Sequence, residues 1–284
     1  MSKPNNVSTV GAKAPNATPT GSSTNNAFFA PAVIVGGLIL SELVYHLVMG
    51  AGSRFEGGDH KNHVLNADPL GLMYKGGFIV PILMTCALCV IVFSIERYLT
   101  LRAAEGNGSI ADFIKRIKGN LDRDNVDAAI GECDKQKGSV ANVVRSGLVK
   151  YKEMLGNTEL DMDQKVGAIQ TEIEETTALE MPMLQRNMAI LSTLASVGTL
   201  IALLGTVLGM IRSFAALGAS GAGDSSALAN GISEALINTA LGIGTSACAI
   251  ILFNYFTAKI DGMSYRIDEA SFTISQAFAT QHKK

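Results

Sequence analysis

The side chains of this chain that could take part in proton chemistry are hydroxyl groups and one carboxylate, set in long apolar runs. Steps of four and three residues place these side chains on one face of a helix: Ser192, Ser196, Thr199, Leu203, Thr206, Met210 and Ser213. Five of these seven carry a hydroxyl group. Hydroxyl groups do not titrate near neutral pH, but they hold water and exchange hydrogen bonds with a carboxylate. The face therefore predicts a water-holding surface that needs a titratable partner.

The last apolar run carries a matching pair of stripes. One stripe consists of Glu234, Asn238, Leu241, Thr245 and Cys248, and the stripe beside it of Ala235, Thr239, Gly242, Ser246 and Ala249. Thr206 lies six residues, about 9 Å, inside Arg212, and Thr239 lies five residues, about 7.5 Å, beyond Glu234. We expect both threonines at similar depth on adjacent antiparallel helices. Five residues turn a helix by about 500°, so Glu234 aligns with Asn238 rather than with Thr239.

Two structural explanations compete with the functional one. Small residues let membrane helices approach closely, which accounts for Gly205, Gly209, Gly242 and Ser246 as packing residues. Glu234 either faces water or protein inside the membrane, or it caps a helix from the headgroup region, where a carboxylate suits the positive end of the helix dipole.

The elements that position these residues are membrane spans. Residues 76–95, 187–211 and 235–258 contain no charged side chain over 20, 25 and 24 residues, and a span takes about 20. Residues 27–49 form a further apolar run with Glu42 as its one formal charge. A signal-like segment or a helix on the membrane surface are the alternatives for this run. The predicted fold is an all-α integral membrane protein with three core transmembrane helices, an additional N-terminal one and long cytoplasmic helical extensions.

Basic residues predict the orientation. Residues 96–190 hold 13 of the 23 Lys and Arg residues, whereas the segment 212–233 holds one, so 96–190 and the C-terminus are expected in the cytoplasm. The predicted order is a disordered N-terminus (1–26), an extra membrane helix (27–49), a periplasmic loop (50–75), a transmembrane helix (76–99), a cytoplasmic helical domain (100–186), a transmembrane helix (187–214), a periplasmic loop (215–233), a transmembrane helix (234–258) and a cytoplasmic C-terminal helix (259–284).

The cytoplasmic stretch predicts a solvated helical bundle. Its apolar residues recur at three- and four-residue spacing behind capping residues, and Asp161 and Asp163 open a long helix that Pro182 could kink near the membrane. With 13 basic and 16 acidic residues over 96–190, it does not indicate nucleic-acid binding.

The sequence has no phosphate-binding loop and no clustered set of catalytic or metal-ligating residues, so no catalysis, metal or cofactor is predicted. Cys86 and Cys89 are interpreted as packing residues.

Three segments together resemble the ExbB/TolQ/MotA family of proton-channel subunits, most closely ExbB. They are GTLIALLGTVLGMIRSF at 198–214, GISEALINTALGIGTSACAIILFN at 231–254, and the GG…PIL…IERYL pattern across 76–99. The resemblance implies a homo-pentamer in the bacterial inner membrane, enclosing two copies of an ExbD-like single-span partner with a membrane aspartate. Proton transfer at that aspartate would energise a TonB-like protein for outer-membrane transport.

By the family's motif, Thr206 and Thr239 would be the pore threonines and Glu234 the glutamate that begins the last span. Asn238, Ser196, Thr199 and Thr245 complete the predicted pathway. Cys248 stands where the family commonly has proline, and Asn238 where it has alanine, which leaves proton and sodium as alternative ions. A TolQ-like subunit for outer-membrane integrity, a non-conducting membrane scaffold, and a membrane enzyme or solute transporter are the competing functions.

Overall fold

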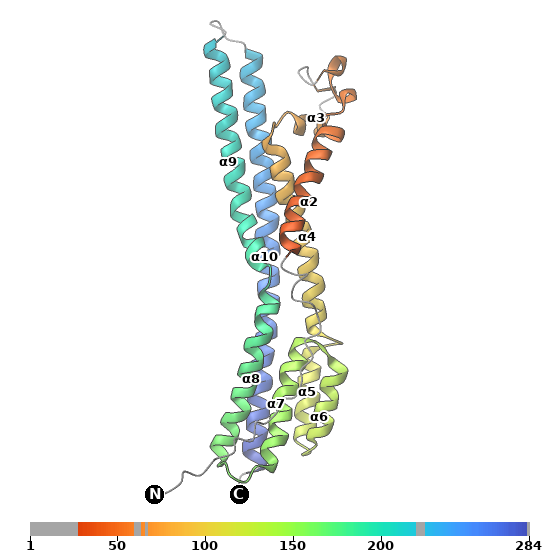
Figure 1. The fold of residues 1–284 in the computed structure, drawn as a ribbon, viewed down its shortest axis with the longest axis vertical. Coiled ribbons are helices and arrows are strands. Elements are labelled where there is room, and N and C mark those ends of the chain that lie inside the picture. Colours follow the sequence, from red (N-terminus) through yellow and green to blue (C-terminus); the bar gives the residue numbers. More distant parts are fainter. Residues whose placement is uncertain (1–27, 60–63, 66–67, 220–224, 283–284) are drawn as a thin grey trace, which may run out of the picture.

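The computed structural model describes residues 28–59, 64–65, 68–219 and 225–282, and its regular elements are helices. The molecule is long and narrow, with α9 (Met188–Ala219) and the first half of α10 (Ser225–Gln281) side by side at one end (Figure 1). The 57 residues of α10 continue without interruption into the other end. The predicted transmembrane helix 234–258 and C-terminal helix 259–284 are therefore parts of one helix.

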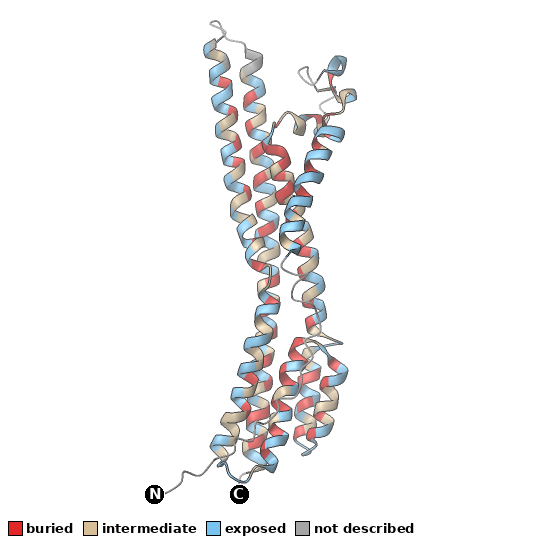
Figure 2. Ribbon diagram, in the orientation of Figure 1, coloured by how far each residue is buried: buried red, intermediate tan, exposed pale blue. Residues whose placement is uncertain are grey.

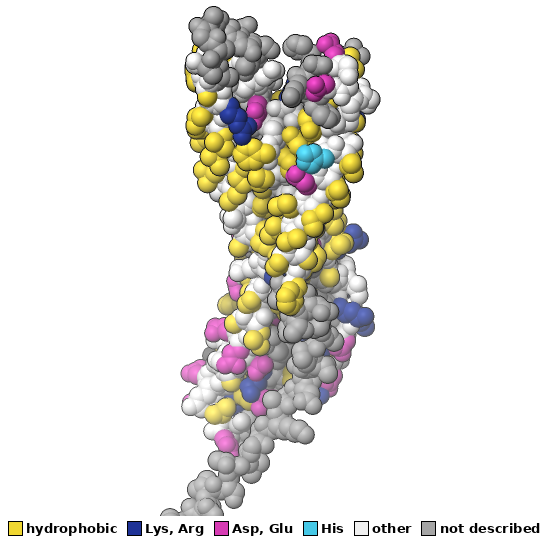
Figure 3. Space-filling model, turned by 45° about the horizontal axis from the view of Figure 1, so that its top comes forward, with side chains coloured by type: hydrophobic (Ala, Val, Ile, Leu, Met, Phe, Trp, Pro, Cys, Tyr) yellow, Lys and Arg dark blue, Asp and Glu magenta, His cyan; other side chains and the backbone are white. Residues whose placement is uncertain are grey.

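Among the described residues, four helices are long and apolar enough to cross a membrane, and one of them lies near the N-terminus. They are α2 (Phe29–Val44), which a π-helical turn extends through Met49, α4 (Ile79–Glu105), α9 and α10. On the face shown in Figure 3, apolar side chains predominate on one half of the molecule, and most of the Asp, Glu, Lys and Arg side chains lie on the other half. The prediction of an all-helical membrane protein with three core spans and an additional N-terminal span is confirmed.

The additional helix α2 packs against α4. A Cβ atom on Gly37 would lie 3.2 Å from Leu88 and 3.5 Å from Thr85, so the two backbones come close. At the other end of the contact, the Tyr45 ring stacks on Tyr74 with centroids 4.6 Å apart, and its hydroxyl donates to the Tyr74 carbonyl over 2.9 Å. These contacts hold α2 against α4 and its π-helical extension against α3.

The predicted loops are partly helical. Residues 50–75 contain α3 (Pro69–Tyr74), whose N-terminus is capped by the Asp68 side chain. The predicted loop 215–233 is mostly taken up by α9, which runs to Ala219, and by α10, which starts at Ser225. The predicted disordered segment 1–26 lies outside the described residues.

The opposite end of the molecule is a helical bundle. It consists of α5 (Ile110–Leu121), α6 (Val126–Gln136), α7 (Gly138–Gly156), α8 (Met162–Gln185) and the second half of α10, and we call it the extramembrane bundle. Side chains of Ser109, Asn125 and Asp161 cap three of its helices, as capping signals in a sequence lead one to expect. Buried residues line the inward faces of these helices (Figure 2).

A sharp break separates α8 from α9. Pro182 lies inside α8 without ending it, and the helix instead ends after Gln185. Arg186 is extended, with ψ 142°, and Asn187 adopts the left-handed conformation, with φ 59°. The long helix that the sequence suggested is thus two helices, joined at Arg186 and Asn187 rather than kinked at Pro182.

Candidate functional site: the contact between α9 and α10

The contact between α9 and α10 is built from small residues facing one another. In this contact, each small residue of α9 (glycine, alanine or serine) faces a small or polar residue of α10. The facing pairs are Gly198 with Ser246, Ala202 with Gly242, Gly205 with Asn238, Gly209 with Ala235, and Ser213 with Gly231. A Cβ atom on Gly242 would lie 2.1 Å from the Ala202 Cβ atom and 2.7 Å from the Gly198 carbonyl oxygen. The absence of side chains therefore lets the two backbones touch, as in close membrane-helix packing.

Thr206 and Thr239 meet beside this contact. Their hydroxyl oxygens lie 2.5 Å apart, and either group can be the donor. Thr206 Oγ1 also reaches the Ala202 carbonyl at 3.1 Å, and Thr239 Oγ1 the Ala235 carbonyl at 3.0 Å. Each hydroxyl has one proton and two lone pairs. The direction of the Thr–Thr hydrogen bond can therefore reverse, since the hydroxyl group that does not donate to the other threonine can donate to a backbone carbonyl. Both side chains are half-buried, so part of the pair is exposed.

Asn238 lies at the centre of the same contact. Its side chain is completely buried against Gly205, and neither atom of its amide group has a hydrogen-bond partner among the described residues. The sequence predicted Asn238 as part of a pathway lining. The structure places it inside the protomer, with no surface that another chain could touch.

Glu234 belongs to a separate cluster at the outer end of the two helices. Its Oε1 atom accepts a hydrogen bond of 2.7 Å from Arg212 Nη1, which joins α10 to α9. Gly77, with φ 76°, lies directly against this carboxylate, since a Cβ atom there would lie 2.4 Å from Glu234 Oε1. The Arg212 guanidinium also lies over the Phe78 ring, 5.1 Å from its centroid. Glu234 thus ties α9, α10 and the start of α4 together.

The remaining predicted residues are spread along the two helices. Ser196 and Thr199 are exposed, and Thr245 is half-buried, one residue from the Ser246 contact. The pairing of Arg212 with Glu234 was not predicted from the sequence, where Arg212 indicated depth and orientation. The signal for that pair was present, because Arg212 and Glu234 carry opposite charges on the two sides of the predicted loop 215–233. The described residues hold no group of three or more His, Cys, Asp or Glu suited to a metal ion.

The fold and this contact define the class: a multi-pass helical membrane protein in which two long helices, α9 and α10, meet through small residues and hydroxyl groups. Residues 136–269 match the sequence profile of the MotA/TolQ/ExbB proton channel family. The chain belongs to that family, which is confirmed as the one the sequence resembles. The matched stretch runs from the extramembrane bundle through both helices of the contact.

Individual relatives support the same assignment. The chain is 38% identical over 96 residues to the putative biopolymer transport protein ExbB-like 3 of Synechocystis sp., covering 32% of this chain and 46% of that protein. It is 30% identical over 108 residues to the biopolymer transport protein ExbB of Xanthomonas campestris, covering 38% and 43%. A Tol-Pal system protein TolQ of Pseudomonas aeruginosa is 25% identical over 190 residues, covering 66% and 80%. The chain thus spans less than half the length of the first two relatives that it matches.

Proposed function

We propose that this chain is the channel-forming subunit of an ExbB-type motor, which uses the proton motive force to energise a TonB-like protein for outer-membrane transport. The observation that carries the proposal is the Thr206–Thr239 hydrogen bond at 2.5 Å, which is partly exposed and flanked by apolar side chains. Such a pair can accept and return a hydrogen bond, but it cannot store a proton by itself. It needs a carboxylate from another chain.

The partner that fits is a single-span, ExbD-like helix with an aspartate in the membrane. In the proposed assembly, five copies of this chain surround two copies of that partner. Large apolar side chains of α9 and α10, among them Leu200, Leu236 and Ile251, are 63%, 65% and 69% exposed in one protomer. These exposed faces provide the surface that lipid, neighbouring copies and the partner helices would cover.

The orientation follows from charge. The extramembrane bundle contains most of the Lys and Arg residues, so it lies in the cytoplasm and the Arg212–Glu234 pair faces the periplasm. The complex then resides in the bacterial inner membrane. One proton crossing a potential of 100 mV releases about 2.3 kcal/mol. A few protons per step are therefore enough to move one rigid element between alternative positions.

A bacterial strain that lacks its own ExbB-type subunit tests the proposal. The strain is supplied with this chain and its single-span partner, and TonB-dependent uptake is measured. We expect uptake with the wild-type chain, and its loss when Thr206→Ala and Thr239→Ala are combined, with the complex still assembled. Normal uptake by the double variant would refute the proposal and favour a scaffold. The mass of the purified complex measures the number of copies.

A TolQ-like role is the second candidate, because the match to TolQ covers 80% of that relative. The two roles are separated in strains lacking one or the other subunit. An ExbB-type chain restores energised uptake, whereas a TolQ-type chain restores resistance to detergents that cross a damaged outer membrane. We expect the first result.

A further inference from the structure

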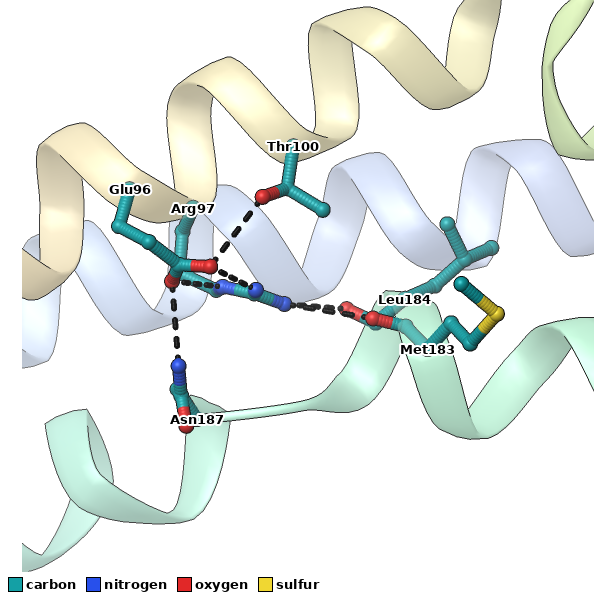
Figure 4. Close-up of polar contacts among 6 residues, drawn as sticks. All are labelled: Glu96, Arg97, Thr100, Met183, Leu184 and Asn187. Carbon is teal, nitrogen blue, oxygen red and sulfur yellow. Dashed lines mark hydrogen bonds and ion pairs between the residues drawn. The ribbon is translucent and has the colours of Figure 1, made fainter. Parts of the chain in front are cut away.

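The largest buried polar group outside the α9–α10 contact is Arg97, near the end of α4 that leads into the extramembrane bundle. Its side chain is 1% exposed, and it lies where α4 passes the break between α8 and α9 (Figure 4). A buried guanidinium is tolerated only where its charge and its hydrogen-bond donors are matched. The groups that contact the Arg97 guanidinium therefore indicate its structural role.

On one side, Arg97 binds the end of α8. Its Nη1 atom donates to the carbonyl of Leu184 at 3.2 Å and, more weakly, to that of Met183 at 3.5 Å. Carbonyl groups in the last turn of a helix lack partners within the helix and form the negative end of its dipole. Arg97, from a different helix, supplies the donors that α8 itself cannot. Figure 4 shows the guanidinium pointing at these carbonyls.

On the other side, the same guanidinium binds Glu96, and Glu96 binds the start of α9. Arg97 Nε and Nη2 donate to the two Glu96 oxygens at 2.7 and 2.5 Å. Glu96 Oε2 in turn accepts a hydrogen bond of 3.3 Å from the Asn187 side-chain amide. The Asn187 backbone carbonyl accepts from the amides of Ile190 and Leu191, in the first turn of α9. One ion pair therefore holds both helix ends that meet at the break.

We propose that Arg97 and Glu96 are positioning residues that set the direction in which α9 leaves the extramembrane bundle, and with it the place of Thr206. We call Glu96, Arg97 and Asn187 together the joint. Thr206 lies 19 residues from Asn187, about 28 Å along the helix. A change of about 5° at the joint would move the Thr206 hydroxyl by about 2.5 Å, enough to break its bond to Thr239. The consequence for conduction rests on the proposed function, whereas the rigidity of the joint does not.

The test compares Arg97→Lys with Arg102→Lys in the full assembled complex. Lysine keeps the charge at residue 97 but cannot donate in a fork to Glu96 while reaching the carbonyls of α8. Arg102 lies on the same helix and is exposed, so its replacement controls for the substitution. Hydrogen exchange is followed by mass spectrometry in peptides covering 188–194 in α9 and 126–136 in α6.

We expect Arg97→Lys to speed exchange of the Ile190 and Leu191 amides at least tenfold, with no change in the α6 peptide or in Arg102→Lys. Unchanged exchange at Ile190 and Leu191, or an equal rise in both peptides, would overturn the proposal, since the second result indicates general destabilisation. If Arg97→Lys does not accumulate, Asn187→Gly takes its place. Glycine keeps the left-handed backbone and removes only the bond to Glu96. About a threefold rise confined to 188–194 is then expected, and no rise would overturn the proposal.

Proton flux through the reconstituted complex is the second readout. It should fall about tenfold in Arg97→Lys and stay at the wild-type level in Arg102→Lys. If hydrogen exchange changes as expected but the wild-type complex conducts no protons, the proposed function is refuted and the role of the joint in holding α8 and α9 is not affected. If the Arg97→Lys complex conducts protons as fast as the wild-type complex, the positioning role is refuted and the proposed function is not affected.

Discussion

The extramembrane bundle and the α9–α10 contact bury opposite kinds of side chain. The bundle encloses Phe113, Leu121, Tyr151 and Phe278, each at most 1% exposed, as in a water-soluble protein. The α9–α10 contact encloses glycine, alanine, serine and Asn238, while leucine and isoleucine point outward. Burying large apolar groups is favourable in water but brings little in lipid, where close backbone approach and hydrogen bonds hold helices together.

The difference shows where function can reside. In the bundle, polar pairs such as Lys152 with Asp127 lie at the surface and contribute little to stability. Between α9 and α10, buried polar side chains such as Asn238 lie directly against the backbone of the opposite helix, so a change in one of them acts on the facing helix. The four predictions that follow test this contrast in order of expected effect.

The largest effect is expected in the core of the bundle. Leu148→Ala removes a fully buried side chain from α7 and should destabilise the protein by about 2–5 kcal/mol, seen as a fall in melting temperature. Leu155→Ala is the matched control, because Leu155 lies on the same helix and is 41% exposed. Equal losses in both variants would show that the bundle is not held by its apolar core.

A smaller loss is expected when a methyl group is added between α9 and α10. Gly242→Ala places a Cβ atom 2.1 Å from the Ala202 Cβ atom, so the helices must separate, at a cost of about 1–3 kcal/mol. Gly244→Ala on the same helix meets nothing within 4 Å and should be neutral or slightly stabilising. Both are measured as melting temperatures in the same detergent. A harmless Gly242→Ala would contradict the close contact.

Gly77 tests the Glu234 cluster. Gly77→Ala and Gly108→Ala both place alanine at a positive φ, which costs about 1–2 kcal/mol, but only the first brings a Cβ atom against Glu234. We expect Gly77→Ala to lower the melting temperature more than Gly108→Ala. Combining Gly77→Ala with Glu234→Ala should close part of that gap. Equal falls in melting temperature in the two single variants would show that the Glu234 carboxylate moves aside at little cost in free energy.

The last prediction concerns the reactivity of Cys133, a buried cysteine of α6. Burial raises the pKa of the Cys133 thiol to about 12, so at pH 8 only about one molecule in ten thousand carries the reactive thiolate. We expect Cys133 to remain unlabelled by iodoacetamide at pH 8 while the protein is folded, and to react once it is unfolded. Raising the pH should increase labelling of the folded protein. Rapid labelling of Cys133 at pH 8 would show that α6 opens readily.

Much of the fold follows from the sequence because its signals are local. Charge-free runs mark the spans, and capping residues mark the starts of α5, α6 and α8. The depth of Thr206 and Thr239 could also be counted from flanking charges. The rotation of a helix about its axis is less accessible: Asn238 was predicted to line the pathway, and its side chain is buried between α9 and α10.

The parts that could not be predicted depend on contacts between distant segments. The Leu184 carbonyl near the end of α8 bonds to Arg97, 87 residues earlier in the chain, and the helix continues past the nearby Pro182. Likewise, the fit of Gly77 against Glu234 joins α10 to a turn that no sequence periodicity connects with it. Pairings of this kind appear only when the helices are assembled.

Proton flux in vesicles tests the role of the threonine pair most directly. The complex of this chain with its single-span partner is reconstituted, and a pH-sensitive dye reports flux under an applied potential. Thr206→Val combined with Thr239→Val should reduce flux at least tenfold. Thr193→Val should not reduce it, because the Thr193 hydroxyl bonds only to the Ala189 carbonyl among the described residues, at 2.8 Å. Undiminished flux in the double variant, with the complex intact, would contradict the account.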